Sequence, residues 1–208
     1  MRSRLRQATG EAIVAAAEDA IAERGLHAAG MVEIAERAGV SVGTLYNHFA
    51  DKDALIAALI AVRRRELAAR IDAALAPRQS DPFRVQLAVF TEAFAAHFEE
   101  HRRFLRILWD EEAARGAPVA RRDESPIAEI HARVEKLMRL GVRERALRGD
   151  GAPLFATAFM AMLKGALTEE TRTGRSVTAS AAALMRLFLD GAALRPARGG
   201  PGKAPPGR

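Results

Sequence analysis

The side chains best suited to chemistry in this sequence lie close together, between positions 41 and 48. Thr44 and Tyr46 carry hydroxyl groups that hydrogen-bond to phosphates and base edges, whereas Val42 carries methyl groups that can contact thymine. Gly43 has no side chain and allows the backbone to approach a partner closely. The combination predicts a surface for double-stranded DNA, formed by Ser41, Val42, Gly43, Thr44, Tyr46, Asn47 and His48.

Two short helices and a tight turn are expected to position this surface. Apolar residues recur at helical spacing over residues 34–38, and Gly39 supplies the left-handed residue that ends a helix. Ser41 then offers a side-chain oxygen to the free N–H groups of a second helix, as an N-cap does. Leu45 and Phe49 are expected to face inward and hold that helix. This order of elements predicts a helix-turn-helix.

The residues that carry a family resemblance extend along this motif and are Ile34, Ala35, Ala38, Gly39, Val40, Ser41, Gly43, Thr44, Leu45, Tyr46, His48, Phe49, Lys52 and Leu55. With them, residues 8–55 resemble the DNA-binding domain of the TetR (tetracycline repressor) family of bacterial transcriptional regulators. The family usually has Thr followed by Ser or Thr before the second helix, where this chain has Ala29 and Gly30. Gly30 still serves as an N-cap, and its helix can present free N–H groups to a phosphate.

The net charge of +6 does not by itself indicate DNA binding, because most of it comes from the two ends of the chain. Arg4 and Arg6 belong to a basic N-terminal arm that is expected to reach phosphates or the minor groove. A disordered, solvated end is the alternative for this segment. Lys52 is expected in the first turn of a helix, where a cation opposes the helix dipole, so a phosphate contact is predicted for it. The alternative is an ordinary solvated lysine.

Composition and motifs exclude several other classes of protein. The chain has no cysteine, which excludes disulfides and thiolate metal sites. It shows neither a signal-peptide pattern nor an apolar run of about 18 residues. A nucleophile elbow, a P-loop and a dinucleotide-binding glycine pattern are also absent from the sequence. We therefore expect a cytoplasmic protein, associated with the nucleoid through DNA, that is not an enzyme and uses no cofactor.

His97 and His101 are four residues apart on a predicted helix and could in principle bind a metal ion together. The zinc-protease arrangement needs a glutamate directly after the first histidine, and this chain has Phe98 there. We therefore expect no metal site, and we interpret the two histidines as part of a solvated helix face.

Apolar periodicity predicts an all-α protein of about nine helices, without the alternation typical of strands. Thr9, Asp51 and the pair Asp81–Pro82 are expected to begin the first, fourth and fifth helices, since Asp and Thr are favoured N-caps and proline is favoured in a first turn. The eighth helix has an unusually wide apolar surface and contains Gly165, which costs about 1 kcal/mol of helix propensity relative to alanine. A close approach of another helix would account for this glycine.

The resemblance implies two domains and a tail. Residues 1–52 form a three-helix DNA-binding domain with the helix-turn-helix and the basic N-terminal arm. Residues 53–194 form a larger helical domain that binds an effector and dimerises, and residues 195–208 form a disordered tail.

Within the larger domain, the resemblance implies an effector pocket enclosed by the middle helices. Aromatic, methionine and histidine side chains there suit a small, largely apolar effector, although each is individually more often plain core. The candidate ligand-binding residues are Phe90, Phe94, Phe98, Trp109, His131, Met138 and Met162.

The resemblance also places the last two helices in a four-helix dimer interface. The candidate interface residues are Phe155, Phe159, Leu163, Leu167, Leu184, Leu187, Phe188 and Gly191.

These features together imply a DNA-binding transcriptional regulator. We expect a homodimeric repressor that binds a palindromic operator and is released from it by a small effector, which must bind the DNA-incompetent state more tightly. The alternative keeps the DNA-binding domain but has a C-terminal bundle that responds to a partner protein or to no small effector. An enclosed cavity among the middle helices favours the first hypothesis, whereas a filled core favours the second.

Overall fold

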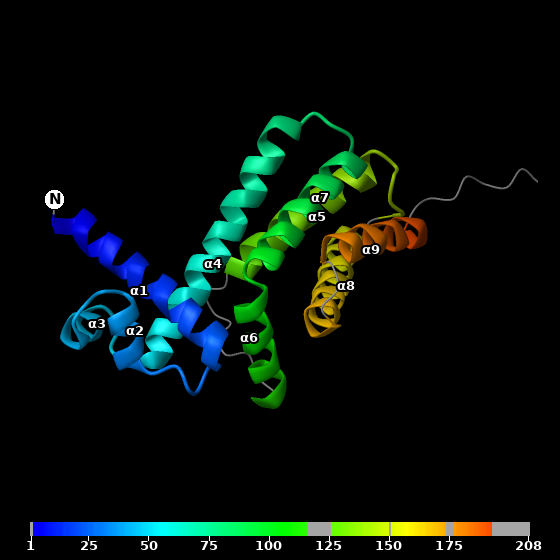
Figure 1. The fold of residues 1–208 in the computed structure, drawn as a ribbon. Helices are drawn as coiled ribbons and strands as arrows, with labels where there is room; N and C mark the ends of the chain where they lie inside the picture. Colours follow the sequence, from blue (N-terminus) through cyan, green and yellow to red (C-terminus); the bar gives the residue numbers. More distant parts are fainter. Residues whose placement is uncertain (1, 116–125, 150, 174–176, 193–208) are drawn as a thin grey trace, which may run out of the picture.

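A computed structural model describes residues 2–115, 126–149, 151–173 and 177–192 of the chain. These residues form nine α-helices and a short 3-10 helix, Ala76–Arg78 (Figure 1). The prediction of an all-α fold is therefore confirmed. In chain order, the α-helices are α1 (Arg2–Arg24), α2 (Met31–Arg37), α3 (Val42–His48), α4 (Lys52–Leu75), α5 (Phe83–Glu100), α6 (Arg102–Arg115), α7 (Pro126–Arg143), α8 (Ala152–Thr173) and α9 (Val177–Ala192).

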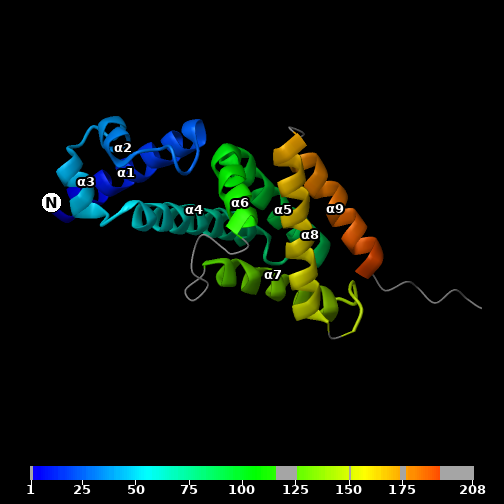
Figure 2. The ribbon, with the colours of Figure 1, turned by 90° about the horizontal axis from the view of Figure 1, so that it is seen from below.

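The helices are arranged in two groups (Figures 1 and 2). Helices α1–α3 lie at one end of the molecule and are called the head (residues 2–49), whereas α8 and α9 lie at the opposite end. The second group, called the body, consists of α5 and α7–α9 together with the second half of α4. Helix α4 runs from the head into the body, and α6 lies between the two.

The first helix begins earlier than the sequence predicts. Helix α1 starts at Arg2, so the predicted basic arm, with Arg4 and Arg6, is helical where the structure describes it. Thr9 is not an N-cap, because its hydroxyl donates to the carbonyl of Leu5 at 2.9 Å inside the helix. The residues before Thr9 are mostly good helix formers, and they extend the helix by two turns.

Other helix boundaries differ in how well the sequence predicts them. Gly25, with φ +87°, ends α1. The Asp51 carboxylate caps α4 by accepting the backbone N–H of Ala54 at 2.7 Å, as the sequence predicts. Asp81 does not cap α5 with its side chain, contrary to the prediction. Instead, the N–H of Phe83 donates to Oε2 of Glu144, next to the end of α7, at 2.9 Å. A carboxylate from a distant part of the chain therefore caps α5.

Apolar side chains of the described residues are buried in two clusters. The head core is formed by α1–α3 and the first half of α4, and Ile13 and Leu45 lie at its centre. The body core is formed by α5, α7–α9 and the second half of α4, around Phe90, Met138 and Phe159. Each such side chain contributes about 1.5–3 kcal/mol by its burial.

Helix α6 packs with the head, although it directly follows α5 of the body. Its residues Phe104, Leu105 and Leu108 are buried in the head core. Phe98, near the end of α5, packs against both cores. The head is therefore attached to the body through α6 as well as through α4.

Gly141 of α7 lies where two other side chains meet this helix. A Cβ atom at Gly141 would lie 2.9 Å from the ring of Phe83 and 2.9 Å from Cδ1 of Leu147. These distances are well below van der Waals contact, so the close packing of α5 against α7 requires glycine here.

We expect Gly141→Ala to destabilise the protein by about 1–3 kcal/mol, because overpacking of the body core outweighs the better helix propensity of alanine. Urea unfolding followed by circular dichroism measures this free energy. Gly10→Ala in α1 is the matched control, since a Cβ there would lie at an ordinary 3.5 Å from the His48 ring. A Gly141→Ala protein with wild-type stability would contradict the expected overpacking.

Candidate nucleic-acid interface

A short, hydrogen-bonded turn joins α2 to α3. Gly39 has φ +68°, a left-handed conformation that favours glycine, and its N–H donates to the carbonyl of Glu36 at 3.1 Å. The N–H of Val40 donates to the carbonyl of Ala35 at 3.0 Å. The turn predicted at Gly39 is confirmed, and it places the start of α3 beside the end of α2.

Ser41 caps α3, as the sequence predicts. Its Oγ accepts the N–H of Thr44 at 3.1 Å and lies 2.8 Å from Oγ1 of Thr44. The Thr44 hydroxyl is therefore already hydrogen-bonded within the motif. A contact between this hydroxyl and a phosphate or base, as predicted, requires it to share or exchange that bond.

One aromatic side chain is prominent on the surface of α3. Tyr46 is 49% exposed, and Gly43 and Asn47 are exposed as well. Val42 is partly buried against the head core, and Leu45 is fully buried in it. Tyr46 is therefore more accessible to a partner than Val42.

The first turns of α1 lie at the same end of the molecule as α3, whose last residue is His48 (Figures 1 and 2). The ring of His48 is partly buried and lies beside Gly10 of α1. Arg4 and Arg6 are exposed on the preceding turns of α1. The structure thus brings the basic residues of the predicted arm to the end that carries the exposed surface of α3.

Gly30 and Lys52 are predicted DNA contacts outside α1 and α3. Gly30 is exposed at the start of α2, and its helix has no side-chain cap. The ammonium of Lys52 donates to the carbonyl of His27, in the loop after α1, at 3.0 Å. The alternative of an ordinary solvated lysine is therefore wrong, because this bond gives the side chain a role inside the head. Its contact with DNA stays a prediction.

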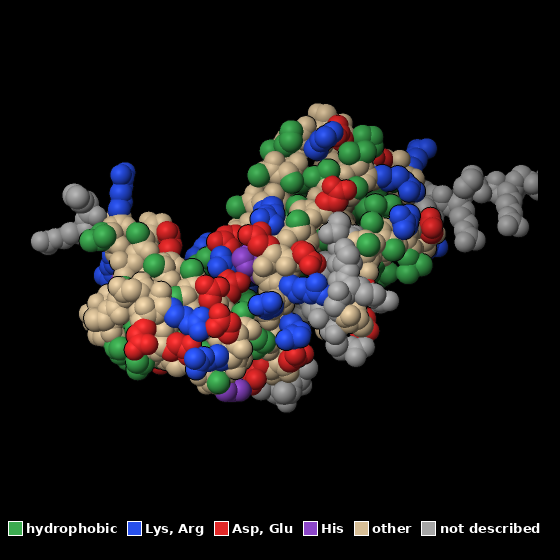
Figure 3. All heavy atoms as spheres, viewed as in Figure 1, with side chains coloured by type: hydrophobic (Ala, Val, Ile, Leu, Met, Phe, Trp, Pro, Cys, Tyr) green, Lys and Arg blue, Asp and Glu red, His purple; other side chains and the backbone are tan. Residues whose placement is uncertain are grey.

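Exposed ion pairs hold α2 against α1. Arg37 of α2 donates to Glu23 of α1 at 2.6 Å and to Glu33 at 2.8 Å, and Arg24 pairs with Glu33 at 3.0 Å. The hydrogen bond from Arg37 holds the pKa of Glu23 below its usual value. Figure 3 shows acidic and basic side chains interleaved on the face over the head and α6. Because these groups are exposed, each pair contributes little stability, and their effect is to orient α2.

Several of the predicted ligand-binding residues stack on one another in the body core. The ring centroids of Phe90 and Phe94 are 5.7 Å apart, and those of Phe94 and Phe98 are 4.7 Å apart. Phe90 and Met138 are fully buried, and Met162 packs against the same core. These side chains of the same chain therefore contact one another where a ligand was expected.

Two further ligand candidates are placed differently. Nε2 of His131 lies 3.1 Å from the hydroxyl of Thr157 on α8, at the surface. The side chain of Trp109 lies outside the described part of the structure. His131 thus contacts a neighbouring helix at the position where a ligand contact was predicted.

The predicted dimer residues divide into a buried and an accessible set. The buried residues lie in the body core of their own chain and are Phe159, Leu163, Leu167 and Phe188. The prediction is wrong for these four, because this side of α8 and α9 packs within the chain and offers a partner no surface. Phe155 and Leu184 are partly buried, and Leu187 and Gly191 are exposed.

Gly165 of α8 was expected to lie close to another helix. Among the described residues of this chain no such neighbour is found, because a Cβ atom at Gly165 would meet nothing within 4 Å.

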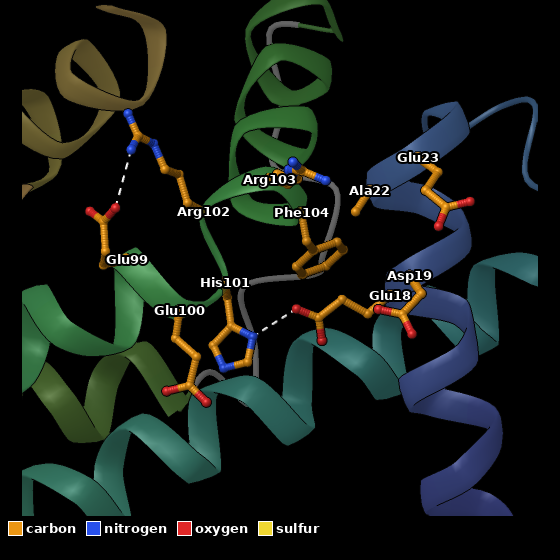
Figure 4. A pocket seen from close by; sticks show the side chains of 10 residues that line it. All are labelled: Glu18, Asp19, Ala22, Glu23, Glu99, Glu100, His101, Arg102, Arg103 and Phe104. Atoms are coloured by element: carbon orange, nitrogen blue, oxygen red, sulfur yellow. Dashed lines mark hydrogen bonds and ion pairs between the residues drawn. The ribbon is translucent and has the colours of Figure 1, made fainter. Parts of the chain in front are cut away.

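A polar cluster that the sequence does not predict lies where the head meets the body. His97 is 3% exposed and the His101 side chain 11%, so the prediction of a solvated helix face is wrong. His101 contacts Glu18 of α1, and both line a hollow of about 310 Å³ between α1 and the junction of α5 with α6 (Figure 4). The available signal was that both histidines continue the helical stripe of Phe90 and Phe94.

The sequence of the head matches the profile of a known protein family. The family profile described as "Bacterial regulatory proteins, tetR family" matches residues 13–59, which extend from α1 into the first half of α4. This segment contains the whole helix-turn-helix. Residues 13–59 therefore match the DNA-binding domain of the TetR family.

A curated relative of this chain is the HTH-type transcriptional activator FasR from Mycolicibacterium smegmatis. The two are 37% identical over 101 residues, which make up 49% of this chain and 45% of FasR. This chain therefore aligns with less than half of that relative. Members of the family are transcriptional regulators, which confirms the prediction that the chain is not an enzyme.

Solved structures extend the likeness over most of the chain. The TetR-family regulator PfmR from Thermus thermophilus has a TM-score of 0.67 at 22% identity and covers 88% of this chain and 99% of its own. The fatty acid degradation regulator FadR from Bacillus halodurans has a TM-score of 0.71 at 19% identity and covers 86% and 94%. At these identities the likeness shows the fold, including the helical C-terminal part.

Neither a metal site nor a membrane span is found among the described residues. No group of three or more His, Asp or Glu side chains comes together there in a way that could hold a metal ion. In the same residues, no helix combines the length and hydrophobicity needed to cross a membrane.

Ser41→Ala is expected to destabilise the head by about 1 kcal/mol, because it removes the N-cap of α3. Ser41→Asp keeps a capping oxygen and should keep the stability, while its negative charge repels DNA phosphates and weakens binding. Thermal unfolding and DNA affinity, measured for both variants, separate the structural role of Ser41 from its predicted DNA contact. If Ser41→Ala unfolded at the wild-type temperature, the bond between Ser41 and Thr44 would not support α3.

Proposed function

We propose that the protein is a homodimeric transcriptional regulator that binds a palindromic DNA operator through α3. The exposed face of α3 carries this proposal. Tyr46 and Asn47 are exposed on a helix that Ser41 caps and that Leu45 anchors in the head core. The TetR family match covers this helix. A helix held in this way can enter the major groove, where its exposed side chains reach base edges.

The accessible groups suit different parts of the duplex. The Tyr46 ring fits a thymine methyl and its hydroxyl a phosphate, and the Asn47 amide can bond to either a phosphate or a base. Gly43 allows the backbone to approach the DNA closely. Arg4 and Arg6, at the same end of the molecule, suit phosphates or the minor groove. Neutralisation of phosphates by these arginines makes the affinity fall with salt.

Footprinting upstream of the gene for this protein and of its neighbours is expected to show a protected palindrome. On that DNA, Tyr46→Ala should bind about tenfold or more weakly, since it removes contacts worth about 1–3 kcal/mol. Tyr46→Phe is the matched control, because it keeps the ring and loses only the hydroxyl. The double variant Arg4→Gln with Arg6→Gln should reduce the salt slope by about 4, because each of the two copies loses two phosphate contacts. An absence of any protected palindrome at saturating protein contradicts the proposal.

A palindromic site calls for two copies of the chain, and α8 and α9 carry a suitable face. Leu154 of α8 is 69% exposed and Leu187 of α9 is 66% exposed. A Cβ on Gly165 or Gly191 would meet nothing within 4 Å, so helices of a second copy can approach closely there. We propose these residues as the dimer interface, in place of the four buried ones.

Leu187→Glu is expected to shift the protein from dimer to monomer, because dimerisation would bury an unpaired carboxylate. The dimer Kd should rise about a hundredfold, which corresponds to about 3 kcal/mol. Analytical ultracentrifugation measures this change, and circular dichroism checks the fold. Val85→Glu is the matched control, since Val85 is an exposed apolar residue of α5. A Leu187→Glu dimer of wild-type strength would place the interface elsewhere.

We further propose that the protein is a repressor controlled through its body. A small, largely apolar effector would have to separate the stacked rings of Phe90, Phe94 and Phe98. The close stacking favours the alternative, in which the body responds to a partner protein or to no small effector. Native mass spectrometry of the gently purified dimer distinguishes the two, because a retained small molecule supports an effector. Since FasR is named as an activator, a reporter fused to the operator tests the sign of regulation.

A further inference from the structure

Helix α9 has one side that packs within the chain and one side that does not. Phe188 and Leu189 are buried in the body core, and α9 lies at the end of the molecule opposite the head (Figures 1 and 2). The exposed side recurs at helical spacing and consists of Ala183, Arg186, Leu187, Asp190 and Gly191. These residues form one continuous surface, which includes the exposed Leu187 of the proposed dimer interface.

Two opposite charges lie on one flank of this surface. Arg186 and Asp190 are one helical turn apart, whereas Leu187 and Gly191 form the other flank. Residues four apart on a helix can form an ion pair. Within the described part of the chain, however, neither Arg186 nor Asp190 is in an ion pair. Both charges are therefore available to a partner.

The position of Asp190 is unfavourable within its own chain. It lies in the last turn of α9, which contains no basic residue, and a carboxylate there opposes the negative end of the helix dipole. Arg148, in the segment after α7, donates to the carbonyl of Gly191 at this end of α9. Its guanidinium is thus bonded to the backbone, and among the described residues it forms no ion pair with Asp190. A cation supplied by another molecule would offset the cost.

The order of the two charges is complementary to itself when two copies of α9 run antiparallel. A two-fold axis across antiparallel helices brings the same flank of each helix together, with the residue order reversed. Arg186 of one copy then lies opposite Asp190 of the other, and the same contact is repeated on the other side of the axis. Parallel copies would instead bring the charged flank against the flank of Leu187, where neither charge finds a partner.

We infer that Arg186 and Asp190 form two crossed ion pairs between two copies of this chain, and that these ion pairs set the register and the antiparallel direction of α9 in the dimer. The inference rests on the proposed homodimer and adds the residues that select its geometry. Burial of Leu187 drives association, but apolar contact has no direction and allows one helix to shift along the other. The charges supply specificity, since such a shift leaves them unpaired or brings like charges together.

The register of α9 matters for DNA binding because it fixes the separation of the two heads. A shift by one helical turn moves one copy by about 5 Å relative to the other. The two copies of α3 must reach half-sites that are about 34 Å apart, or a multiple of that distance. Within each chain the head is held to the body by Phe104, Leu105 and Leu108 of α6. A displacement at α9 is therefore carried to α3.

Charge reversal at either position tests these ion pairs. In its homodimer, Arg186→Asp brings carboxylates together at both contacts, and Asp190→Arg brings guanidinium groups together. The dimer Kd of each variant is expected to rise about tenfold, which corresponds to about 1.4 kcal/mol. Analytical ultracentrifugation at constant ionic strength measures the Kd, and circular dichroism checks the fold. Arg84→Asp is the matched control and should keep the wild-type Kd, because Arg84 is an exposed arginine of α5 that forms no ion pair among the described residues.

A mixture of the two variants gives the deciding measurement. A mixed dimer of Arg186→Asp with Asp190→Arg has opposite charges at both contacts, so it should form with near wild-type strength. Native mass spectrometry resolves the three dimers by mass, and the mixed dimer should far exceed the share of about half that random pairing gives. A chain with both substitutions should also dimerise like the wild type, because the order of its charges is reversed in both copies. Random pairing, or a double variant as weak as the single ones, would overturn the inference.

The same experiments distinguish a failure of the ion pairs from a failure of the proposed function. A monomeric wild type, or a dimer that Leu187→Glu does not weaken, would refute the proposed interface together with the ion pairs. A dimer that Leu187→Glu weakens, but whose charge variants pair at random, would refute the ion pairs alone. Preferential mixed dimers in a protein that protects no palindrome would support the ion pairs and refute the proposed DNA-binding function.

Discussion

The position of the head relative to the body depends above all on the burial of α6 in the head core. Helix α6 follows α5 after a single residue, so its backbone is tied to the body, yet Phe104, Leu105 and Leu108 are buried with side chains of the head. Each of these contributes about 1.5–3 kcal/mol, more than an exposed ion pair. Helix α3 is therefore held at a set place relative to α8 and α9, and a dimer formed through those helices would hold two copies of α3 at a set spacing.

Local chemistry made the helix-turn-helix predictable from sequence. Gly39, Ser41 and Asp51 each act on backbone groups a few residues away, and each does in the structure what its residue type predicts. Two contacts that the sequence does not predict are non-local. Lys52 bonds to a carbonyl 25 residues away, and Glu144 caps a helix that begins 61 residues before it. Such partners are set by the tertiary fold, so no pattern among neighbouring residues reveals them.

Periodicity identified the apolar sides of the body helices but not what each side contacts. The side of α8 that contains Phe159 was assigned to a second copy of the chain, whereas its ring lies 6.4 Å from Phe90 and 5.1 Å from Phe188 of the same chain. Leu187 points elsewhere and is exposed. A helix shows the same 3.6-residue period whether it packs within its chain or against a partner. The more apolar face of a helix can therefore be buried within its own chain, and the less apolar face is then the one that is accessible to a second copy.

Stability alone does not account for the polar cluster at Glu18. Its members lose most of their hydration, and replacement of such buried ion pairs by apolar side chains is often neutral or stabilising. Phe104 already supplies apolar contact in the same place, so the attachment of α6 does not require charges. The charged groups instead define the orientation of α1 relative to α4 and α6, because both oxygens of Glu18 are hydrogen-bonded only when Arg63 and His101 both point towards it. Apolar contact has no preferred direction, so the charged cluster and the packing of Phe104 have different roles at this junction.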